Sequence, residues 1–322
     1  MTRFHSLTLA AAALALAPAF TSAQTFPAKT ITFVVPFAAG TATDQIARAV
    51  ASGVTAETKQ AVVIDNKAGA SGFIASQQVA KAAPDGYTVL ITTNTTHAAN
   101  EHLFKNLPYD PVKDFAPVTA LGKGGQIMVV NPAFPAKTVA EFVALAKKEP
   151  GKYTFGSGSS SSRMAGELLQ QMAGIKLLHV PYKSNTLAVT DLLGTQIDMM
   201  ITDTATGLPQ VKADKLRALG VSSVQRSPLA PEVPTIAEAG VKGYEMGYWF
   251  AAYVPAGTPP AMVSRLNELL VKAARSEAAK KAFYEPTGTE VFTTLPQELA
   301  KFQIGESQKW GRIVKAAGIE AE

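Results

Sequence analysis

The chain has 322 residues, of which 47% are apolar and 17% charged, and its 30 basic and 25 acidic residues leave a formal charge of +5. This apolar content supports a folded core and excludes general disorder, and the scattered Lys and Arg form no basic patch of the kind typical of nucleic-acid-binding proteins. Cysteine is absent and only four His occur, which excludes disulfides, thiolate nucleophiles and Cys-based metal sites. We therefore expect one large or two medium domains with no metal, no cofactor and no nucleic-acid partner.

Residues 1–23 have the pattern of a secretory signal peptide. Arg3 supplies a positive start, Leu7–Ala17 is an apolar run of 11 residues, and a small-residue triplet ends at Ala23. The apolar run is shorter than the roughly 20 residues that span a bilayer, and a buried Ala/Leu helix is the other interpretation. We predict cleavage after Ala23 and a soluble periplasmic protein, because no cysteine is available for a lipid anchor.

From residue 30 onward, apolar β-branched runs alternate with amphipathic stretches. Thr30–Phe37 is a continuous apolar run, which indicates a strand buried on both faces as in a parallel sheet. The expected elements of this first unit are that strand, a helix over 43–57, a strand at Ala61–Asp65, a helix at Phe73–Ala83 and a strand at Tyr87–Thr92. This order predicts an α/β fold with a mostly parallel sheet flanked by helices.

A second unit with the same alternation follows, and the chain ends in helices. Its expected strands are Ile127–Val130, Lys152–Phe155, Lys176–Pro181, Ile197–Thr202 and Leu216–Ser222, with helices at Val139–Lys148, after the loop Gly156–Ser162, and at Leu187–Leu193. Pro228–Gly243 is rich in Pro and Gly and indicates a surface connection around a short helix at Ile236–Ala239. A strand at Trp249–Val254 and helices near Pro259–Arg275, Glu277–Tyr284 and Pro296–Ala317 are expected to close the chain.

Two α/β units on one chain predict two lobes that face a cleft. Because the C-terminal helices must pack on one of them, we expect crossings near Ala120–Gly125 and Leu219–Ser223. The predicted first lobe comprises residues 24–121 and 222–322, and the second comprises 122–221. Gly122, Gly124 and Gly125 stand where a hinge would absorb backbone rotation, with a plain loop as the alternative.

The segment 36–44 joins the first buried strand to a helix N-terminus. Ligands of open α/β sheets bind at the carboxyl ends of strands, and the unpaired N–H groups and dipole of a helix start favour an anion. Small residues let a ligand approach the backbone, and threonines add hydroxyl donors. The candidate binding residues are Phe37, Ala39, Gly40, Thr41, Thr43 and Asp44. An ordinary capped helix is the alternative interpretation.

The segment 155–163 repeats this order of strand, small polar loop and helix start in the second unit. Its hydroxyl and N–H groups can surround a carboxylate or a phosphate, and the candidates are Ser157, Ser159, Ser160, Ser161 and Ser162. The sequence contains no P-loop, no dinucleotide-binding fingerprint and no GxSxG nucleophile elbow. A flexible Gly/Ser linker is the alternative, although amphipathic structure follows at once.

Further polar residues are expected at the same sheet edges. Asn94, Thr95 and Thr96 end the third strand of the first unit, and Asp203 ends a strand of the second, where it could bind a ligand hydroxyl or amine or cap a helix. Tyr182 could line the pocket, although core packing is the usual role of an aromatic side chain. A Ser-His-Asp hydrolase is the enzymatic alternative, but no local pattern singles out a nucleophile, so no catalytic residue is predicted.

Eight short motifs in this order together resemble the extracytoplasmic solute receptors of tripartite tricarboxylate transporters, also called Bug receptors. They are PFAAGTATDQIAR (36–48), VVIDNKAGASG (62–72), APDGYTVL (83–90), FGSGSSSS (155–162), HVPYK (179–183), DLLGTQIDMM (191–200), VPTIAEAG (233–240) and PAGTP (255–259). The resemblance implies a two-lobed periplasmic binding protein that holds a small organic acid anion between its lobes, near residues 37–44, 157–162 and Asp203. The implied partners are that anion and the membrane components of the transporter.

Two departures from the family pattern lie near this expected pocket. Thr41 follows Gly40 where the family often has a second glycine, and residues 184–186 replace a Gly-rich run, so both changes add side chains. No Arg is placed to clamp a carboxylate unless Arg163 turns inward, which favours binding through N–H and hydroxyl donors. Aromatic mono- or dicarboxylates and short aliphatic di- or tricarboxylates both fit, with an aromatic acid favoured. We expect a monomer, and a partner that presents ligand to a sensor is the other functional alternative.

Overall fold

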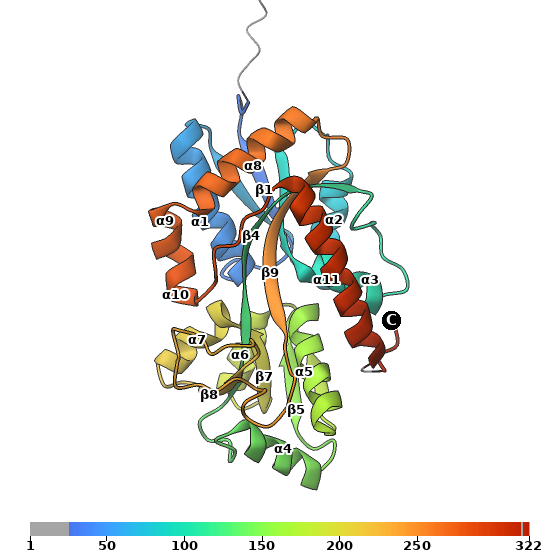
Figure 1. Cartoon of the computed structure of the whole chain (residues 1–322), viewed down its shortest axis with the longest axis vertical. Coiled ribbons are helices and arrows are strands. Elements are labelled where there is room, and N and C mark those ends of the chain that lie inside the picture. Colours follow the sequence, from blue (N-terminus) through green and yellow to red (C-terminus); the bar gives the residue numbers. More distant parts are fainter. Residues whose placement is uncertain (1–25, 317, 322) are drawn as a thin grey trace, which may run out of the picture.

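Two α/β lobes share one long strand, β4 (Phe115–Val130), in the computed structural model, which describes residues 26–316 and 318–321. The first part of β4 pairs with β9 (Gly247–Pro255), and the part from Gln126 to Val130 pairs with strands of the second lobe. Figure 1 shows β4 and β9 running from one lobe toward the other. The predicted fold class is confirmed, while the predicted signal peptide lies outside the described residues.

The first lobe is a sheet with the strand order β2-β1-β3-β9-β4. Its strands β1 (Ile31–Val35), β2 (Val62–Asn66) and β3 (Thr88–Thr93) are parallel, whereas β9 is antiparallel to both of its neighbours. One face is covered by α1 (Ala42–Thr58) and α8 (Pro260–Ala274), and the other by α2 (Phe73–Ala80), α3 (Asn100–Leu103) and α11 (Pro296–Ala316). Two short helices, α9 (Glu277–Ala279) and α10 (Glu285–Thr287), connect α8 to the segment before α11.

The second lobe continues from β4 in the order β7-β5-β6, and β8 also pairs with β4. Its strands are β5 (Thr154–Ser157), β6 (Leu178–Pro181), β7 (Met199–Asp203) and β8 (Arg217–Val221). Helices α4 (Val139–Lys148) and α5 (Ser160–Ala173) cover one face, and α6 (Asn185–Leu193) and α7 (Thr204–Lys212) cover the other. Both lobes are therefore three-layered, with their helices starting where strands end.

The continuous apolar run of the first strand is explained by burial on both faces. Ile31, Phe33 and Val35 pack with the α1 and α8 side of the first lobe, and Val34 packs with the opposite side. The alternation of a strand sends successive side chains to opposite faces, so a strand between two helical layers needs apolar residues at every position. Among the described residues, no helix has both the length and the apolar character needed to cross a bilayer.

The plain loop given as the alternative at residues 120–125 is wrong, because these residues lie inside strand β4, and the hinge there stays a prediction. The predicted strand Ile127–Val130 is only the last part of β4. A Cβ atom at Gly124 would lie 2.5 Å from the Tyr248 hydroxyl, and one at Gly125 would lie 2.8 Å from the Ser223 Cβ. The absence of side chains at Gly124 and Gly125 leaves space for Tyr248 and Ser223. These glycines therefore permit β4 and β9 to pack closely at the junction of the lobes.

The connection after β8 packs against the second lobe. The Ile236 N–H donates to the Val221 carbonyl at 2.8 Å, and the Tyr244 hydroxyl donates to the Ala165 carbonyl at 2.8 Å. Residues 236–239 form a turn rather than the predicted short helix. We therefore propose that the second lobe extends to Met246 rather than ending before residue 222. The rest of the predicted lobe division stays a prediction.

Replacement of Trp310 in α11 tests how far the C-terminal helix stabilises the fold. Trp310 is 1% exposed, so Trp310→Ala should leave a cavity and lower the free energy of unfolding by about 3–5 kcal/mol. Ile304 lies in the same helix but is 48% exposed, and Ile304→Ala should change stability by about 0.5 kcal/mol or less. Urea unfolding followed by far-UV circular dichroism measures both, and equal losses would contradict this packing.

Candidate ligand-binding site between the lobes

A cavity of about 400 Å³, its opening to solvent included, lies between the two lobes and is called the inner cavity here. The predicted candidates that line it come from both lobes and are Phe37, Thr41, Thr43, Asn94, Ser159, Ser161 and Asp203. The two loops predicted to bind a ligand therefore face one shared space. Within this lining, Asp203 is the one residue with a charged side chain.

The start of α1 forms one wall of the inner cavity. Gly40 has a φ of +83°, a left-handed conformation that glycine adopts without strain, and it turns the chain into the helix. Thr41 is the N-cap residue but its side chain makes no capping bond, because its hydroxyl donates to the Ala38 carbonyl at 2.8 Å. The amide groups at the first turn of α1 therefore have no side-chain cap and can bind an acceptor in the cavity.

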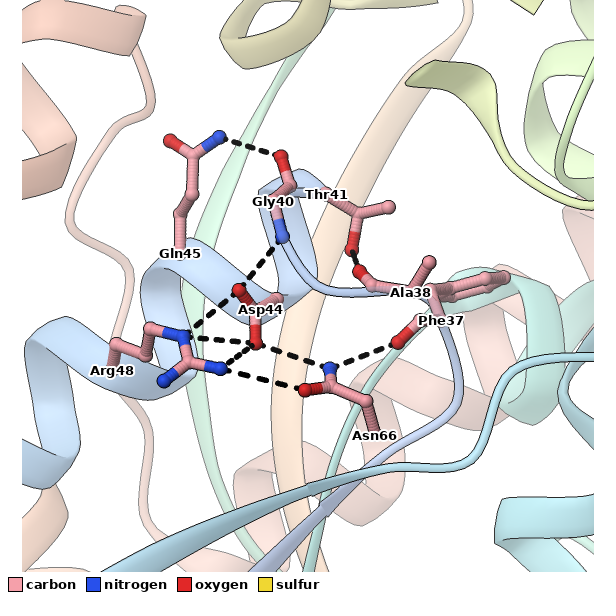
Figure 2. A network of polar contacts seen from close by, with 8 residues as sticks. All are labelled: Phe37, Ala38, Gly40, Thr41, Asp44, Gln45, Arg48 and Asn66. Atoms are coloured by element: carbon pink, nitrogen blue, oxygen red, sulfur yellow. Dashed lines mark hydrogen bonds and ion pairs between the residues drawn. The ribbon is translucent and has the colours of Figure 1, made fainter. Parts of the chain in front are cut away.

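The Asp44 carboxylate holds this loop in place from behind (Figure 2). It accepts hydrogen bonds from the Gly40 N–H at 2.9 Å, from the Asn66 Nδ2 at 3.0 Å and from Arg48, which also forms an ion pair with it. The Asn66 Nδ2 also donates to the Phe37 carbonyl at 2.9 Å, so one network joins both ends of the loop. Burial raises the pKa of Asp44, but the bonds from Arg48, Gly40 and Asn66 outweigh it and hold that pKa below its ordinary value.

The start of α5 forms the opposite wall. Ser159 is its N-cap residue and its Oγ accepts from the Ser162 N–H at 3.2 Å. The Gly158 N–H donates to Asn185 Oδ1 at 3.0 Å, which ties the loop to the start of α6. A Cβ atom at Gly158 would lie 1.8 Å from the Ser184 carbonyl carbon, so only glycine allows the two helix starts to approach this closely.

Asp203 and Asn185 complete the wall of the second lobe. Asp203 Oδ1 accepts from the N–H and hydroxyl of Thr206, both at 2.8 Å, and therefore caps α7. Asp203 Oδ2 accepts from Asn185 Nδ2 at 3.0 Å. Asn185 was not predicted as a site residue, although it belongs to the three residues that depart from the family pattern. The starts of α5, α6 and α7 thus meet the start of α1 around the inner cavity.

Side chains of β3 and β9 line the inner cavity where the two lobes join. Thr93, Tyr248 and Phe250 contribute to the lining and were not predicted from the sequence. The Tyr248 hydroxyl lies 2.9 Å from the Thr204 hydroxyl in α7 and 2.9 Å from the Thr289 hydroxyl after α10. Burial raises the pKa of Tyr248 to about 12, so the hydroxyl keeps its proton and can link the two threonines. Tyr248 therefore links the two lobes beside the inner cavity.

Several candidates predicted from the sequence do not line the inner cavity. Ala39 and Gly40 are exposed on the loop before α1, and Asp44 supports that loop. Thr95 and Thr96 are fully buried in a helical turn behind the site, where Thr96 bonds to Thr92 and His97. The Ser162 hydroxyl donates to the Ile201 carbonyl inside the second lobe.

A second hollow of about 1080 Å³, open solvent included, adjoins the inner cavity and is called the outer hollow here. The two share Phe37, Gly158 and Ser159. The remaining predicted candidates, Ser157, Ser160 and Tyr182, line the outer hollow. The Ser160 hydroxyl donates to Asn100 Oδ1 at 2.8 Å and so joins the start of α5 to α3 of the other lobe.

Two α/β lobes with helix N-termini turned toward a cavity between them define a solute-binding receptor of the periplasmic binding protein class. The chain belongs to the family described as tripartite tricarboxylate transporter family receptor, which matches residues 46–319. The resemblance predicted from the eight sequence motifs is therefore confirmed.

Solved structures support the same assignment. The chain is 33% identical to Rpa4515 of R. palustris with adipate, with a TM-score of 0.89, and the match covers 92% of this chain and 100% of that one. It is 32% identical to the periplasmic binding protein BugD, with a TM-score of 0.88 and the same coverage. It is 30% identical to MatC of Rhodopseudomonas palustris with bound malate, with a TM-score of 0.85, over 90% of this chain and 100% of that one. These neighbours are binding proteins rather than enzymes.

Replacement of Tyr248 by Phe tests whether its hydroxyl holds the lobes together. Loss of the bonds to Thr204 and Thr289 should weaken the affinity for a ligand about three- to tenfold, the effect of about one hydrogen bond. The ligand-free variant should also have a larger radius of gyration in small-angle X-ray scattering. Tyr284→Phe is the control, because the Tyr284 hydroxyl donates to Leu121 within the first lobe. Equal effects of the two substitutions would exclude a role in joining the lobes.

Replacement of Asp44 by Asn tests whether the carboxylate stabilises the loop. At neutral pH the free energy of unfolding should fall by about 1–2 kcal/mol, because bonds to a charged acceptor are lost. The folded pKa of Asp44 lies below 3.8, so its stabilisation is complete above that pH and is lost as the pH falls through the lowered pKa. The difference between the two proteins should therefore shrink below about pH 4 in urea unfolding. A difference that is constant with pH would contradict this assignment.

Proposed function

We propose that this receptor captures a small organic carboxylate between its lobes and passes it to the membrane components of a tripartite tricarboxylate transporter. The observation that carries the proposal is the meeting of four helix starts around an inner cavity whose lining contains no Lys or Arg. Helix N-termini bind anions through unpaired amides and the helix dipole, without a cationic side chain. A carboxylate is the anion that fits both this environment and the family.

The donors at the inner cavity are numerous enough for useful affinity. A dissociation constant of 1 μM corresponds to about −8 kcal/mol, and each charge-assisted hydrogen bond contributes about 1.5–3 kcal/mol. The first amides of α1, the hydroxyls of Thr43 and Ser161, and Ser159 supply such donors. The Asp203 carboxylate repels an anion, so the carboxylate of the ligand lies toward α1 and α5 and away from Asp203.

Export to the periplasm fits this function. The N-terminal 23 residues have a signal-peptide pattern, and BugD is described as a periplasmic binding protein. Adipate and malate, bound by two of the neighbours, are both dicarboxylates, which favours short aliphatic acids in addition to the aromatic acids expected from the sequence. We propose that the receptor acts as a monomer.

A screen of organic acids tests the proposal. Carboxylates of two to eight carbons, aliphatic and aromatic, should include some that raise the melting temperature, since a ligand that binds only the folded state stabilises it. Ser159→Leu should abolish this shift by filling the inner cavity. Ser276→Leu is the matched control, because Ser276 caps α9 as Ser159 caps α5, with an Oγ that accepts from the amide three residues on at 3.2 Å, and each substitution costs about 1 kcal/mol of capping.

The same screen separates the proposal from its alternatives. Shifts that persist in Ser159→Leu, or no shift with any carboxylate, would contradict the inner cavity as a carboxylate site. Hydrolysis of model esters that is lost in Ser157→Ala would favour a hydrolase, because the Ser157 hydroxyl lies 2.7 Å from His179 Nε2. If growth on a low concentration of the identified acid requires this protein, the receptor acts in uptake rather than in presentation of the ligand to a sensor.

A further inference from the structure

A third pocket, called the rear pocket here, has a volume of about 1210 Å³ with its opening to solvent included. Residues of α10 and of the start of α7 line it, and Figure 1 shows these helices on the side of β4 and β9 away from α3 and α5. Among the described residues, none lines both the rear pocket and the inner cavity or the outer hollow. The rear pocket is therefore separate from the proposed carboxylate site.

Both lobes contribute walls to the rear pocket. Leu229 of the second lobe packs against the first lobe at Gly288, where a Cβ atom would lie 3.1 Å from Leu229 Cδ1. Thr204 and Thr289 also line the pocket, one from each lobe, and both hydroxyls bond to Tyr248, which lines the inner cavity. These three side chains separate the two spaces, and a molecule in the rear pocket would contact both lobes.

The side chain of Gln126 offers an unpaired acceptor to the rear pocket. Gln126 lies on β4, lines the pocket and is 1% exposed, and its Oε1 has no hydrogen-bond partner among the described residues. Its backbone groups are both paired with Ser222, whose Oγ accepts from the Gln126 N–H at 2.6 Å and whose N–H donates to the Gln126 carbonyl at 2.8 Å. Buried polar atoms are nearly always hydrogen-bonded, so this amide oxygen is suited to a donor from a bound molecule.

The basic side chains of the rear pocket already have acidic partners. Three of them line the pocket, and each forms an ion pair with a glutamate. The pairs are Lys123–Glu290 at 3.5 Å, Arg226–Glu238 at 2.8 Å and Lys280–Glu277 at 2.7 Å. An anion would have to compete with these glutamates, so the paired basic groups do not favour an anionic ligand.

Glu285 is the acidic residue of this lining that has no such partner. It belongs to α10 of the first lobe, is exposed, and its carboxylate makes no hydrogen bond or ion pair with another residue of the described chain. The unpaired groups of the pocket are therefore a carboxylate on the first lobe and a buried amide oxygen on β4. Both are acceptors, and one of them is negatively charged.

We propose that the rear pocket is a second ligand site, which binds a small organic amine carrying a further hydrogen-bond donor. The ammonium group pairs with Glu285, and the further donor binds Gln126 Oε1. Each contact uses a group that is otherwise unpaired, so binding breaks no bond within the protein. The inner cavity and the rear pocket then prefer ligands of opposite charge.

A titration with 1,4-diaminobutane followed by ¹H–¹⁵N NMR tests this inference, because it reports both the affinity and the place of binding. The amide signals of Gly124, Gly125 and Gly288, which line the rear pocket, should shift. Glu285→Gln should weaken binding about two- to fivefold, the range for an exposed ion pair. The uncharged analogue 1,4-butanediol should bind the wild type more weakly than the diamine and should bind Glu285→Gln and the wild type equally.

Gln126→Leu tests the second contact by the same titration. It removes the acceptor and should weaken binding of 1,4-diaminobutane about three- to tenfold, the effect of one hydrogen bond. Butylamine has the same four-carbon chain without the second donor, and its binding should be unchanged by this substitution. If the variant does not fold, the comparison of Glu285→Gln with the wild type still decides the inference.

Two control variants locate the amine. Glu268→Gln removes an exposed glutamate of the first lobe that lies outside the rear pocket, and it should leave binding unchanged. Ser159→Leu fills the inner cavity, where Asp203 could also attract an amine, and should leave binding unchanged too. Loss of binding in Ser159→Leu, equal weakening by Glu285→Gln and Glu268→Gln, or no binding of the diamine would overturn the inference. None of these outcomes bears on the proposed function, which is tested with carboxylates.

Discussion

The binding site depends on backbone amides that a helix cannot pair by itself. The first turn of an α-helix leaves N–H groups without intrahelical acceptors. Helices α1, α5, α6 and α7 start at the carboxyl ends of strands, and β4 and β9 bring the two lobes together at those ends. Four helix starts therefore surround one cavity. The preference for an anion that we propose follows from the path of the backbone and requires no Lys or Arg in the lining.

Hydrogen bonds between side chains and the surrounding segments keep these amides in place. Asp44 joins both ends of the loop before α1, and Asn185 joins the loop before α5 to Asp203. Tyr248 links the two lobes beside the cavity. Because these residues bond to segments of the protein rather than to solvent, the small residues of the two loops can present their backbone to a ligand in a defined arrangement.

The sequence located the two loops that border the inner cavity but could not separate the residues that face the cavity from those behind it. Asn94 lines the inner cavity, whereas Thr95 and Thr96, its neighbours, are buried in a helical turn. Strand ends can be predicted because apolar runs stop there, yet the direction of each side chain after the last strand residue depends on how the turn packs. Gly122, Gly124 and Gly125 suggested a hinge or a loop rather than strand residues, because the close packing of Gly124 against Tyr248 and of Gly125 against Ser223 involves residues far along the chain.

The amino-acid sequence by itself determined the alternation of strands and helices, the α/β class, the family and the position of both candidate loops. These properties follow from local periodicity, from residues at strand ends and from motif order, all of which are readable along the chain. Only the tertiary structure decided that β4 serves both lobes and that Tyr248 and Asn185 border the site. Such contacts join residues distant in sequence, and packing alone decides which of them meet.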